Sequence, residues 1–220
     1  MSRPHGEGPG PITRDGCAVE LYALLPAGRE PGIVHAAIPA GASILELGAG
    51  AGRLTHPLLA LGHPVVAVDD SPEMLAHVRG GETVLGRIET LRLGRRFDTV
   101  LLASHLVNTD DDRQRRQFLL ACRRHVRGGG AVLLQRHDPA WFDTAAPSRR
   151  TEAGVTFELG DLSRPGPGLL SATVAYQVGE RRWTQRFTAR RLDDAELAAE
   201  LAATGLAVDA WLDDRTWVRA

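Results

Sequence analysis

Three glycines alternate with other residues at Gly48, Gly50 and Gly52, directly after the hydrophobic run Ile44–Leu47. At a strand-to-helix turn, glycines let the backbone pass close to a ligand. A second hydrophobic run ends at Asp69, seventeen residues after the last glycine. A carboxylate at the end of the next strand can bind ribose hydroxyls. These residues therefore predict a nucleotide-type site.

The residues around the glycines indicate which ligand this turn would bind. A dinucleotide fingerprint requires a glycine where this chain has Arg53, because the helix must pack closely there. Glu46 lies two residues before the first glycine, and an acidic side chain suits a positively charged ligand better than phosphates. An NAD(P)-dependent oxidoreductase on a Rossmann sheet is kept as an alternative, against which Arg53 counts.

Two histidines further along the chain can do proton chemistry, because each comes directly after a hydrophobic run. Imidazole titrates near neutral pH, so His105 can serve as a general base. It can equally pack on a ligand or bond a backbone group. His137 backed by Asp138 can form an oriented base, whereas the neighbouring Arg136 can instead bind an acidic acceptor.

The segments that must position these residues alternate between strand and helix, which predicts a parallel sheet. Strands are expected at 43–47, 65–69, about 83–88, 97–103 and 131–136. Helices are expected at about 52–61, from the N-cap Ser71 with Pro72, and from the acidic run 110–112 to 125.

After residue 136 the pattern changes to alternating segments joined by turn signals. The segments 155–159, 169–178 and 182–188 predict an antiparallel meander of about three strands. A last helix is expected at 193–204, followed by strands at 206–212 and 216–219.

The composition is that of one globular domain. Of the 220 residues, 43% are hydrophobic and 24% are charged. Residues 1–15 are rich in Gly, Pro and charge and are expected to form a disordered tail, which leaves 16–220 as the domain. The net charge of −1 gives no overall field that favours nucleic acid.

Cysteine and lysine usage restricts the chemistry further. Cys17 and Cys122 are too few for a disulfide framework or a zinc site, and we predict no metal. All 26 basic residues are arginine, so no lysine can act as a base or nucleophile. The chain starts without the apolar run of a secretory signal and has no stretch of membrane-spanning length, so we expect a cytoplasmic protein.

Four motifs in order, at 46–53, 68–74, 97–100 and 127–130, make the chain similar to the class I S-adenosylmethionine-dependent methyltransferases over about residues 17–220. The resemblance implies an α/β fold. A Rossmann-like, mostly parallel sheet of seven strands has helices on both faces and an antiparallel terminal strand. The meander at about 153–190 would be a small insertion after the fifth strand that covers the acceptor site.

The resemblance also implies S-adenosyl-L-methionine as the cofactor and a set of residues that hold it. Backbone of the glycine turn would approach the methionine and ribose, Asp69 would accept from the ribose hydroxyls, and Met74 would pack on the adenine or belong to the core. Glu46 would orient groups near the cofactor's amino group or cap the loop as a structural acid. The expected cofactor-binding residues are Glu46, Gly48, Ala49, Gly50, Asp69, Asp70, Met74, Arg87, Ile88, Glu89 and Ser104.

The adenine end departs from the family pattern. The loop after the third strand normally supplies an acid to the adenine amine, but that position here holds Arg87, which cannot accept a hydrogen bond. Either Glu89 replaces the acid, or the backbone amide of Ile88 holds the ring alone.

The catalytic residues expected from the resemblance are His105 and His137. Ser104 and His105 would lie beside the transferable methyl group, and Tyr22, Trp141 and Phe142 would line an apolar acceptor pocket or belong to the core. Methyl transfer is an in-line displacement that chiefly requires alignment and exclusion of water.

The acceptor is expected to be a small molecule methylated on oxygen, nitrogen or carbon. Family members that methylate DNA bases carry an Asn/Asp-Pro-Pro-aromatic motif after the fourth strand, where this chain has 103–106, Ala-Ser-His-Leu. We therefore expect no nucleic acid, no membrane, and a monomer or homodimer. A non-catalytic S-adenosylmethionine-binding protein remains a further alternative.

Overall fold

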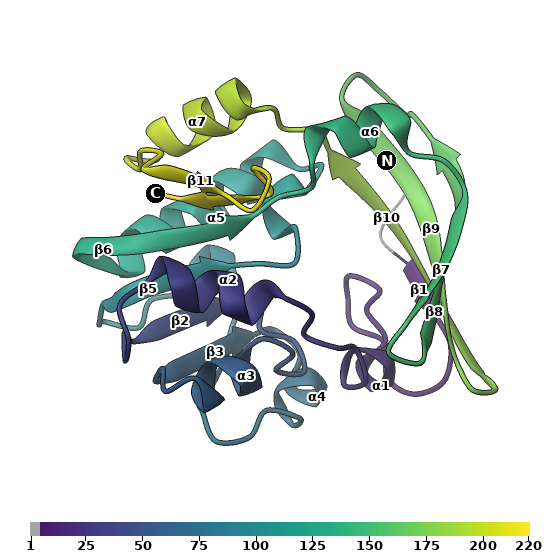
Figure 1. Cartoon of the computed structure of the whole chain (residues 1–220), viewed down its shortest axis with the longest axis horizontal. Helices are drawn as coiled ribbons and strands as arrows, with labels where there is room; N and C mark the ends of the chain where they lie inside the picture. Colours follow the sequence, from purple (N-terminus) through teal and green to yellow (C-terminus); the bar gives the residue numbers. More distant parts are fainter. Residues whose placement is uncertain (1–4) are drawn as a thin grey trace.

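The computed structural model describes residues 5–220 and contains two separate sheets (Figure 1). The larger sheet has the strand order β11-β12-β6-β5-β2-β3-β4. Its strands are β2 (Ile44–Leu47), β3 (Val65–Asp69), β4 (Glu82–Leu85), β5 (Phe97–Leu102), β6 (Val126–Gln135), β11 (Ala210–Leu212) and β12 (Trp217–Arg219). The strands from β4 to β6 are parallel, whereas β12 runs antiparallel to β6 and β11 antiparallel to β12. The predicted seven-stranded, Rossmann-like fold is confirmed.

Helices cover both faces of this sheet, because its strands are apolar on both sides. Leu45 and Val100 pack with buried residues of α5 (Asp112–His125) and α7 (Asp194–Ala202). Ile44 and Leu101 pack on the other face with α2 (Glu30–Ala37) and α3 (Thr55–Ala60). Cys122 is fully buried in the first of these cores.

The helix starts follow the capping signals of the sequence. Ser71 caps α4 (Pro72–Leu75) by accepting from the Met74 amide at 3.1 Å, and Asp111 caps α5. Asp193 caps α7 in a capping box with Glu196. The helix α3 begins at Thr55 and not near Gly52, because the glycine turn continues to that residue.

The second sheet is fully antiparallel, with the order β1-β10-β9-β8-β7. Its strands are β1 (His5–Glu7), β7 (Ser148–Glu152), β8 (Val155–Ser163), β9 (Leu169–Val178) and β10 (Arg181–Arg190). The three strands predicted for the meander are confirmed as β8, β9 and β10. The sequence did not indicate β7 and β1.

The expected disordered tail at 1–15 is wrong for residues 5–15; residues 1–4 lie outside the described part of the chain. The strand β1 pairs with β10, and the Trp183 indole nitrogen donates to the Pro9 carbonyl at 2.9 Å. The glycines that suggested disorder allow close packing instead. A Cβ at Gly6 would lie 2.0 Å from the Gly16 carbonyl oxygen, and one at Gly8 would lie 2.3 Å from the Trp183 ring.

The five-stranded sheet stands opposite the carboxyl edge of the seven-stranded sheet (Figure 1). At one end α1 (Val19–Tyr22) supplies Leu21, which packs with Trp183. At the other end α6 (Pro139–Thr144) supplies Phe142, which packs with Leu170 and Ala189. Within residues 5–220, none of the helices combines the length and apolar character needed to cross a bilayer.

Candidate active site at the carboxyl edge

The glycine turn after β2 adopts the conformation that its glycines permit. Gly48, Gly50 and Gly52 have φ of 72°, 57° and 87°, in the left-handed region that other residues rarely adopt. The amides of Gly48 and Ala49 both donate to the Val68 carbonyl at 2.9 Å, which fixes the turn against β3. The turn therefore presents a rigid backbone surface at the end of two strands.

Asp69 is tied to this turn by its side chain. Its half-buried carboxylate accepts from the Gly50 amide at 2.8 Å and from the Ser71 amide at 3.0 Å, one on each oxygen. Burial raises the pKa of Asp69, and these two amide bonds oppose the shift. Each oxygen keeps a lone pair that can accept from a ligand hydroxyl. The neighbouring Asp70 is more exposed and accepts from the Arg14 guanidinium at 3.2 Å.

Glu46 lies beneath the turn with only 3% of its surface exposed. The Thr55 hydroxyl, at the start of α3, donates to its carboxylate at 2.5 Å. Burial raises the pKa of Glu46 to about 7, against the lowering effect of the Thr55 hydrogen bond and the Arg53 charge. This contact is the one expected of a structural acid that holds the loop to its helix.

The residues predicted for the adenine end gather at the same turn. A Cβ built on Gly50 would lie 3.9 Å from the Met74 sulfur, and one on Gly48 would lie 3.7 Å from Cδ1 of Ile88. Met74 is buried in a small cluster with Val19 and Ala51. Met74 and Ile88 thus flank the glycines from two elements.

Glu89 follows Ile88 in the 3-10 helix η1 (Ile88–Thr90) and already has two partners. Arg87 lies 3.0 Å from its carboxylate, and the Gln114 amide donates to it at 3.2 Å. Burial raises the pKa of Glu89, but the hydrogen bonds outweigh burial and the pKa is lowered. Glu89 is therefore an ionised acceptor, and Arg87 orients it.

The chain leaves β5 through a strained turn. Ser104 and His105 have φ of 53° and 60°, left-handed values that cost about 1–3 kcal/mol for each residue with a Cβ. The Ser104 amide donates to the Gln135 side chain at 2.8 Å, and its hydroxyl accepts from Arg53 at 3.2 Å. Two neighbouring residues in this conformation direct His105 away from the path of the strand.

The two predicted catalytic histidines lie against each other. The ring centroids of His105 and His137 are 3.8 Å apart with an interplanar angle of 12°, and Trp141 stacks on His137 at 4.7 Å. Burial lowers the pKa of His105 to about 4 and lowers the pKa of His137 as well. The expectation that His105 titrates near neutrality is thus wrong, because burial of the ring disfavours its charged form. Within residues 5–220, the buried Nδ1 of His105 has no hydrogen-bond partner.

The structure contradicts two roles that the sequence suggested, that of Asp138 as the partner of His137 and that of Arg136 as an acceptor-binding residue. Asp138 does not orient His137; it caps α6 by accepting from the Ala140 amide at 2.9 Å. Arg136 cannot bind an acceptor, because it is 1% exposed and donates to the Arg215 and Leu192 carbonyls and to Asp194.

Two further hydrogen-bonded side chains join this site to distant parts of the chain, Asn108, which the sequence did not indicate, and Tyr22, which it indicated only as an apolar or core residue. Asn108, in the 3-10 helix η2 (Leu106–Asn108), accepts from the His137 amide at 2.9 Å and donates to the Arg190 carbonyl at 2.8 Å. It therefore holds the histidine against β10. Tyr22 donates to Gln185 at 3.1 Å and so joins α1 to the same strand. Both bonds join residues far apart in the chain, where no local motif can reveal them.

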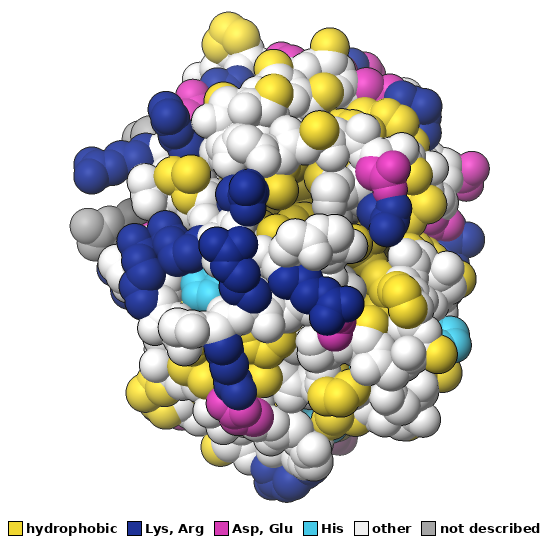
Figure 2. Space-filling view, turned by 90° about the vertical axis from the view of Figure 1, so that its left-hand side faces the viewer, with side chains coloured by type: hydrophobic (Ala, Val, Ile, Leu, Met, Phe, Trp, Pro, Cys, Tyr) yellow, Lys and Arg dark blue, Asp and Glu magenta, His cyan; other side chains and the backbone are white. Residues whose placement is uncertain are grey.

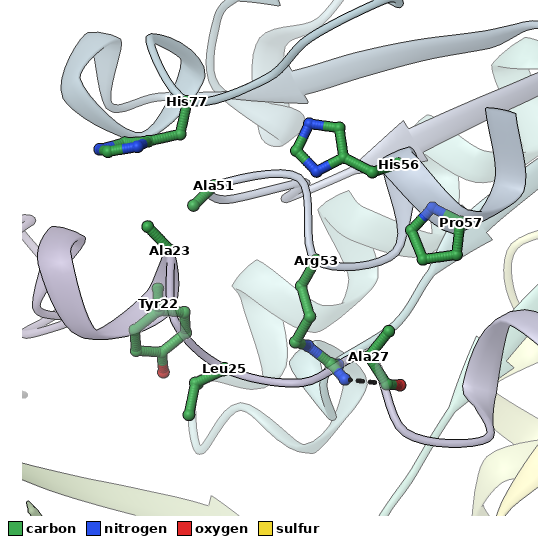
Figure 3. A pocket seen from close by; sticks show the side chains of 9 residues that line it. All are labelled: Tyr22, Ala23, Leu25, Ala27, Ala51, Arg53, His56, Pro57 and His77. Atoms are coloured by element: carbon green, nitrogen blue, oxygen red, sulfur yellow. Dashed lines mark hydrogen bonds between the residues drawn. The ribbon is translucent and has the colours of Figure 1, made fainter. Parts of the chain in front are cut away.

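A pocket of about 290 Å³ borders the outer side of the glycine turn (Figure 3). It is lined by Tyr22, Ala23, Leu25, Ala27, Ala51, Arg53, His56, Pro57 and His77. Arg53 reaches across it to the Ala27 carbonyl at 3.3 Å and to Glu30 at 2.9 Å. This pairing gives Arg53 a structural role where a dinucleotide fingerprint has glycine, and the pocket contains neither Glu46 nor Asp69.

Residues 44–130, from β2 to the start of β6, match the family model described as a methyltransferase domain. These residues form a methyltransferase domain. The chain is also 31% identical over 163 residues to the cypemycin N-terminal methyltransferase of a Streptomyces species. That alignment covers 68% of this chain and 65% of the relative, so it spans slightly less than two thirds of the relative's length.

Solved structures share the fold of most of this chain. The CcbJ methyltransferase of Streptomyces caelestis has a TM-score of 0.72 at 24% identity over 89% of both chains. CalS10, an amino pentose methyltransferase of Micromonospora echinaspora with bound SAM, has a TM-score of 0.67 at 24% identity over 88% of both chains. The predicted resemblance to S-adenosylmethionine-dependent methyltransferases is confirmed.

Proposed function

We propose that the protein transfers the methyl group of S-adenosyl-L-methionine to an amine nitrogen of a small-molecule or short peptide acceptor. The observation that carries this proposal is the arrangement at the carboxyl edge. A rigid glycine turn with a fixed carboxylate, Asp69, lies beside two stacked imidazoles, His105 and His137. The relatives support nitrogen as the target atom, since one is named an N-terminal methyltransferase and another a sugar N-methyltransferase.

The residues of the turn fit the proposed cofactor. Asp69 has free lone pairs for two ribose hydroxyls, and Met74 and Ile88 supply apolar surface for a flat ring. Glu89 is an ionised acceptor for an exocyclic amine, with Arg87 holding it in place. When bound, the cofactor supplies an activated methyl group on a sulfonium. We propose that Ser104 lies beside that group, and that the more exposed Asp70 contributes at the ribose edge.

The histidines would orient the acceptor, which binds as the free amine after losing its proton to solvent. A ring with a pKa of about 4 is neutral at physiological pH, and because Nδ1 of His105 is buried, the other ring nitrogen, Nε2, would accept a hydrogen bond from an amine N–H. That bond leaves the nitrogen lone pair free to point at the methyl carbon, as in-line displacement requires. His137 and Trp141 support the ring from one side and exclude water. The product ammonium loses its proton to solvent on release.

We infer that the sheet at about 153–190 covers the acceptor. Its inner face is buried by α1 at one end and by α6 at the other, and between them the paired residues Leu159, Val174 and Gln185 stay half-buried. This row would give the acceptor two apolar side chains, Leu159 and Val174, and one side-chain amide, that of Gln185. We propose that the protein is cytoplasmic and is a monomer or homodimer. We also propose that its substrate is not a nucleic acid, since the net charge is −1.

Calorimetry and methyl transfer test these proposals separately. We expect S-adenosylhomocysteine to bind the purified protein and NADPH not to bind; the reverse result refutes the cofactor. Labelled methyl should then pass from S-adenosylmethionine to primary amines and not to matched alcohols. Cofactor binding without turnover on any acceptor would indicate a non-catalytic binding protein, and turnover on the alcohols alone would refute nitrogen as the target.

A further inference from the structure

Three arginines gather at the amino edge of the seven-stranded sheet, opposite the proposed active site. Arg92 and Arg96 belong to the loop before β5, and Arg124 belongs to the last turn of α5. We call Arg92, Arg96 and Arg124 the arginine patch. Figure 2 shows basic side chains grouped on the side of the molecule that lies at the left of Figure 1.

Hydrogen bonds to backbone carbonyls hold the patch together. Arg92 and Arg124 both donate to the Leu91 carbonyl, at 2.7 and 3.2 Å, which brings two guanidinium groups to one oxygen. Arg96 donates to the carbonyl of Val126, directly after α5, at 3.1 Å. Each guanidinium has five N–H donors, so each keeps several for a ligand.

No acidic side chain of residues 5–220 lies within ion-pair distance of these three arginines. At the flanks of the patch, by contrast, Arg95 pairs with Glu82 and Arg127 pairs with Asp98. Two pKa shifts follow from the like charges of the patch. Burial lowers the pKa of Arg124, and the charge of Arg92 lowers it further. Burial also lowers the pKa of the adjacent His125, and the charges of Arg124, Arg92 and Arg96 add to that shift. An anionic ligand would relieve this repulsion.

We propose that the arginine patch binds a carboxylate-rich segment of a partner protein. Guanidinium groups at fixed positions match carboxylates in forked geometry. A nucleic acid fits less well. Specific binding to a duplex uses about 6–10 phosphate contacts, more than three cations can supply. Single-strand binding also uses exposed aromatic rings, and Phe97, the aromatic residue beside Arg95, is buried.

The distance between the arginine patch and the proposed methyl-transfer site determines whether a bound partner can reach that site. The strand β6 runs from Val126, beside Arg96, to Gln135, beside Ser104. Ten strand residues span about 30 Å, so a segment bound at the patch does not reach the proposed methyl-transfer site. The interaction would attach the enzyme to another protein while the carboxyl edge stays open.

Fluorescence anisotropy with a labelled oligoglutamate peptide tests the proposal on the full chain. We expect saturable binding that weakens as salt is added. The double variant R92Q/R124Q should weaken binding by about tenfold, because two charge-assisted contacts are lost. The matched control R149Q/R182Q removes two exposed arginines that pair with Glu158 on the smaller sheet, and it should bind the peptide as the parent does.

Several results would overturn the proposal. These are the absence of binding, equal loss in the control, and tighter binding of an oligothymidylate of the same charge. Since Arg92 and Arg124 also brace the Leu91 carbonyl, R96Q alone provides a second variant, and a thermal melt confirms that each variant is folded. The assay needs no methyl transfer, so its outcome is independent of the proposed activity.

Discussion

The cofactor side and the acceptor side of the carboxyl edge are built from different kinds of contact. On the cofactor side, Asp69 bonds Gly50 and Ser71, and Glu46 bonds Thr55, all within residues 46–71. On the acceptor side, Asn108 bonds β10 across 82 residues and Tyr22 bonds Gln185 across 163 residues. The cofactor side is therefore carried by short motifs, whereas the acceptor side depends on how the whole chain folds.

This difference indicates which of the two ligands, cofactor or acceptor, can change without loss of the other. Motif contacts within the glycine turn define one ligand, because each polar group is fixed by a neighbour in sequence. Contacts between the two sheets can be rearranged without touching that turn. A domain of this type can thus keep its methyl donor while its acceptor changes, which agrees with the varied acceptors named for its structural relatives.

The largest effect should come from His105, on the acceptor side. We expect H105N to lower kcat by about 10²-fold, the size of loss that misalignment of a reacting group causes. The affinity for S-adenosylhomocysteine should not change. Stopped assays with labelled methyl measure the first quantity and calorimetry measures the second. H137F is the companion variant, since it keeps a ring between His105 and Trp141; a loss equal to that of H105N would assign the chemistry to His137.

On the cofactor side, D69N should lower cofactor affinity by about 30-fold, because one carboxylate oxygen is replaced by an amide that cannot accept from a hydroxyl. Calorimetry with S-adenosylhomocysteine measures this change. D70N should alter affinity by less than about threefold, since Asp70 is more exposed and bonds Arg14. Equal losses in the two variants would mean that the two acids act together.

The stability of the cofactor side should depend on pH through Glu46. Its pKa is raised from 4.5 to about 7, so the folded protein holds the proton more strongly than the unfolded chain. Stability is then full below pH 4.5 and falls as pH rises toward 7. We expect the free energy of unfolding to fall by about 2 kcal/mol relative to E46Q between pH 5 and 7.5. Urea melts at both pH values measure it, and parallel curves would disprove the buried charge.

The smallest effect should come from the bond between Tyr22 and Gln185 on the acceptor side. Y22F removes the donor to Gln185 and should raise the acceptor KM by about fivefold, because a lost hydrogen bond contributes about 1 kcal/mol. Y176F is the control, since within residues 5–220 the Tyr176 hydroxyl donates to no side chain, although its ring packs in the same cluster. An unchanged KM in Y22F would show that the Gln185 row does not contact the acceptor.

The same division explains what the sequence could predict. The strand order, the caps at Ser71 and Asp193, and the residues around Gly48–Gly52 follow local rules, and the structure bears them out. The role of Arg136 was misjudged because its partners, such as the Arg215 carbonyl, lie far along the chain, where no local pattern reveals them. The role of Asp138 did follow a local rule, since Asp138-Pro139 begins α6 as Ser71-Pro72 begins α4.

The sequence also could not predict that His105 and His137 are packed against each other. The spacing placed His105 after a strand, but its stack with His137 forms only when β5 and β6 lie side by side. That stack moves the pKa of His105 far from the value of free imidazole. A role in proton chemistry thus depends on packing that a single sequence cannot supply.

The strand β1 has a consequence for the order in which the protein is made. Its three residues, His5–Glu7, are synthesised about 180 positions before their partners in β10. During translation this stretch stays unpaired until β10 has been made. The strand β1 can therefore join the smaller sheet only after β10 exists, so its pairing reports that synthesis has passed β10.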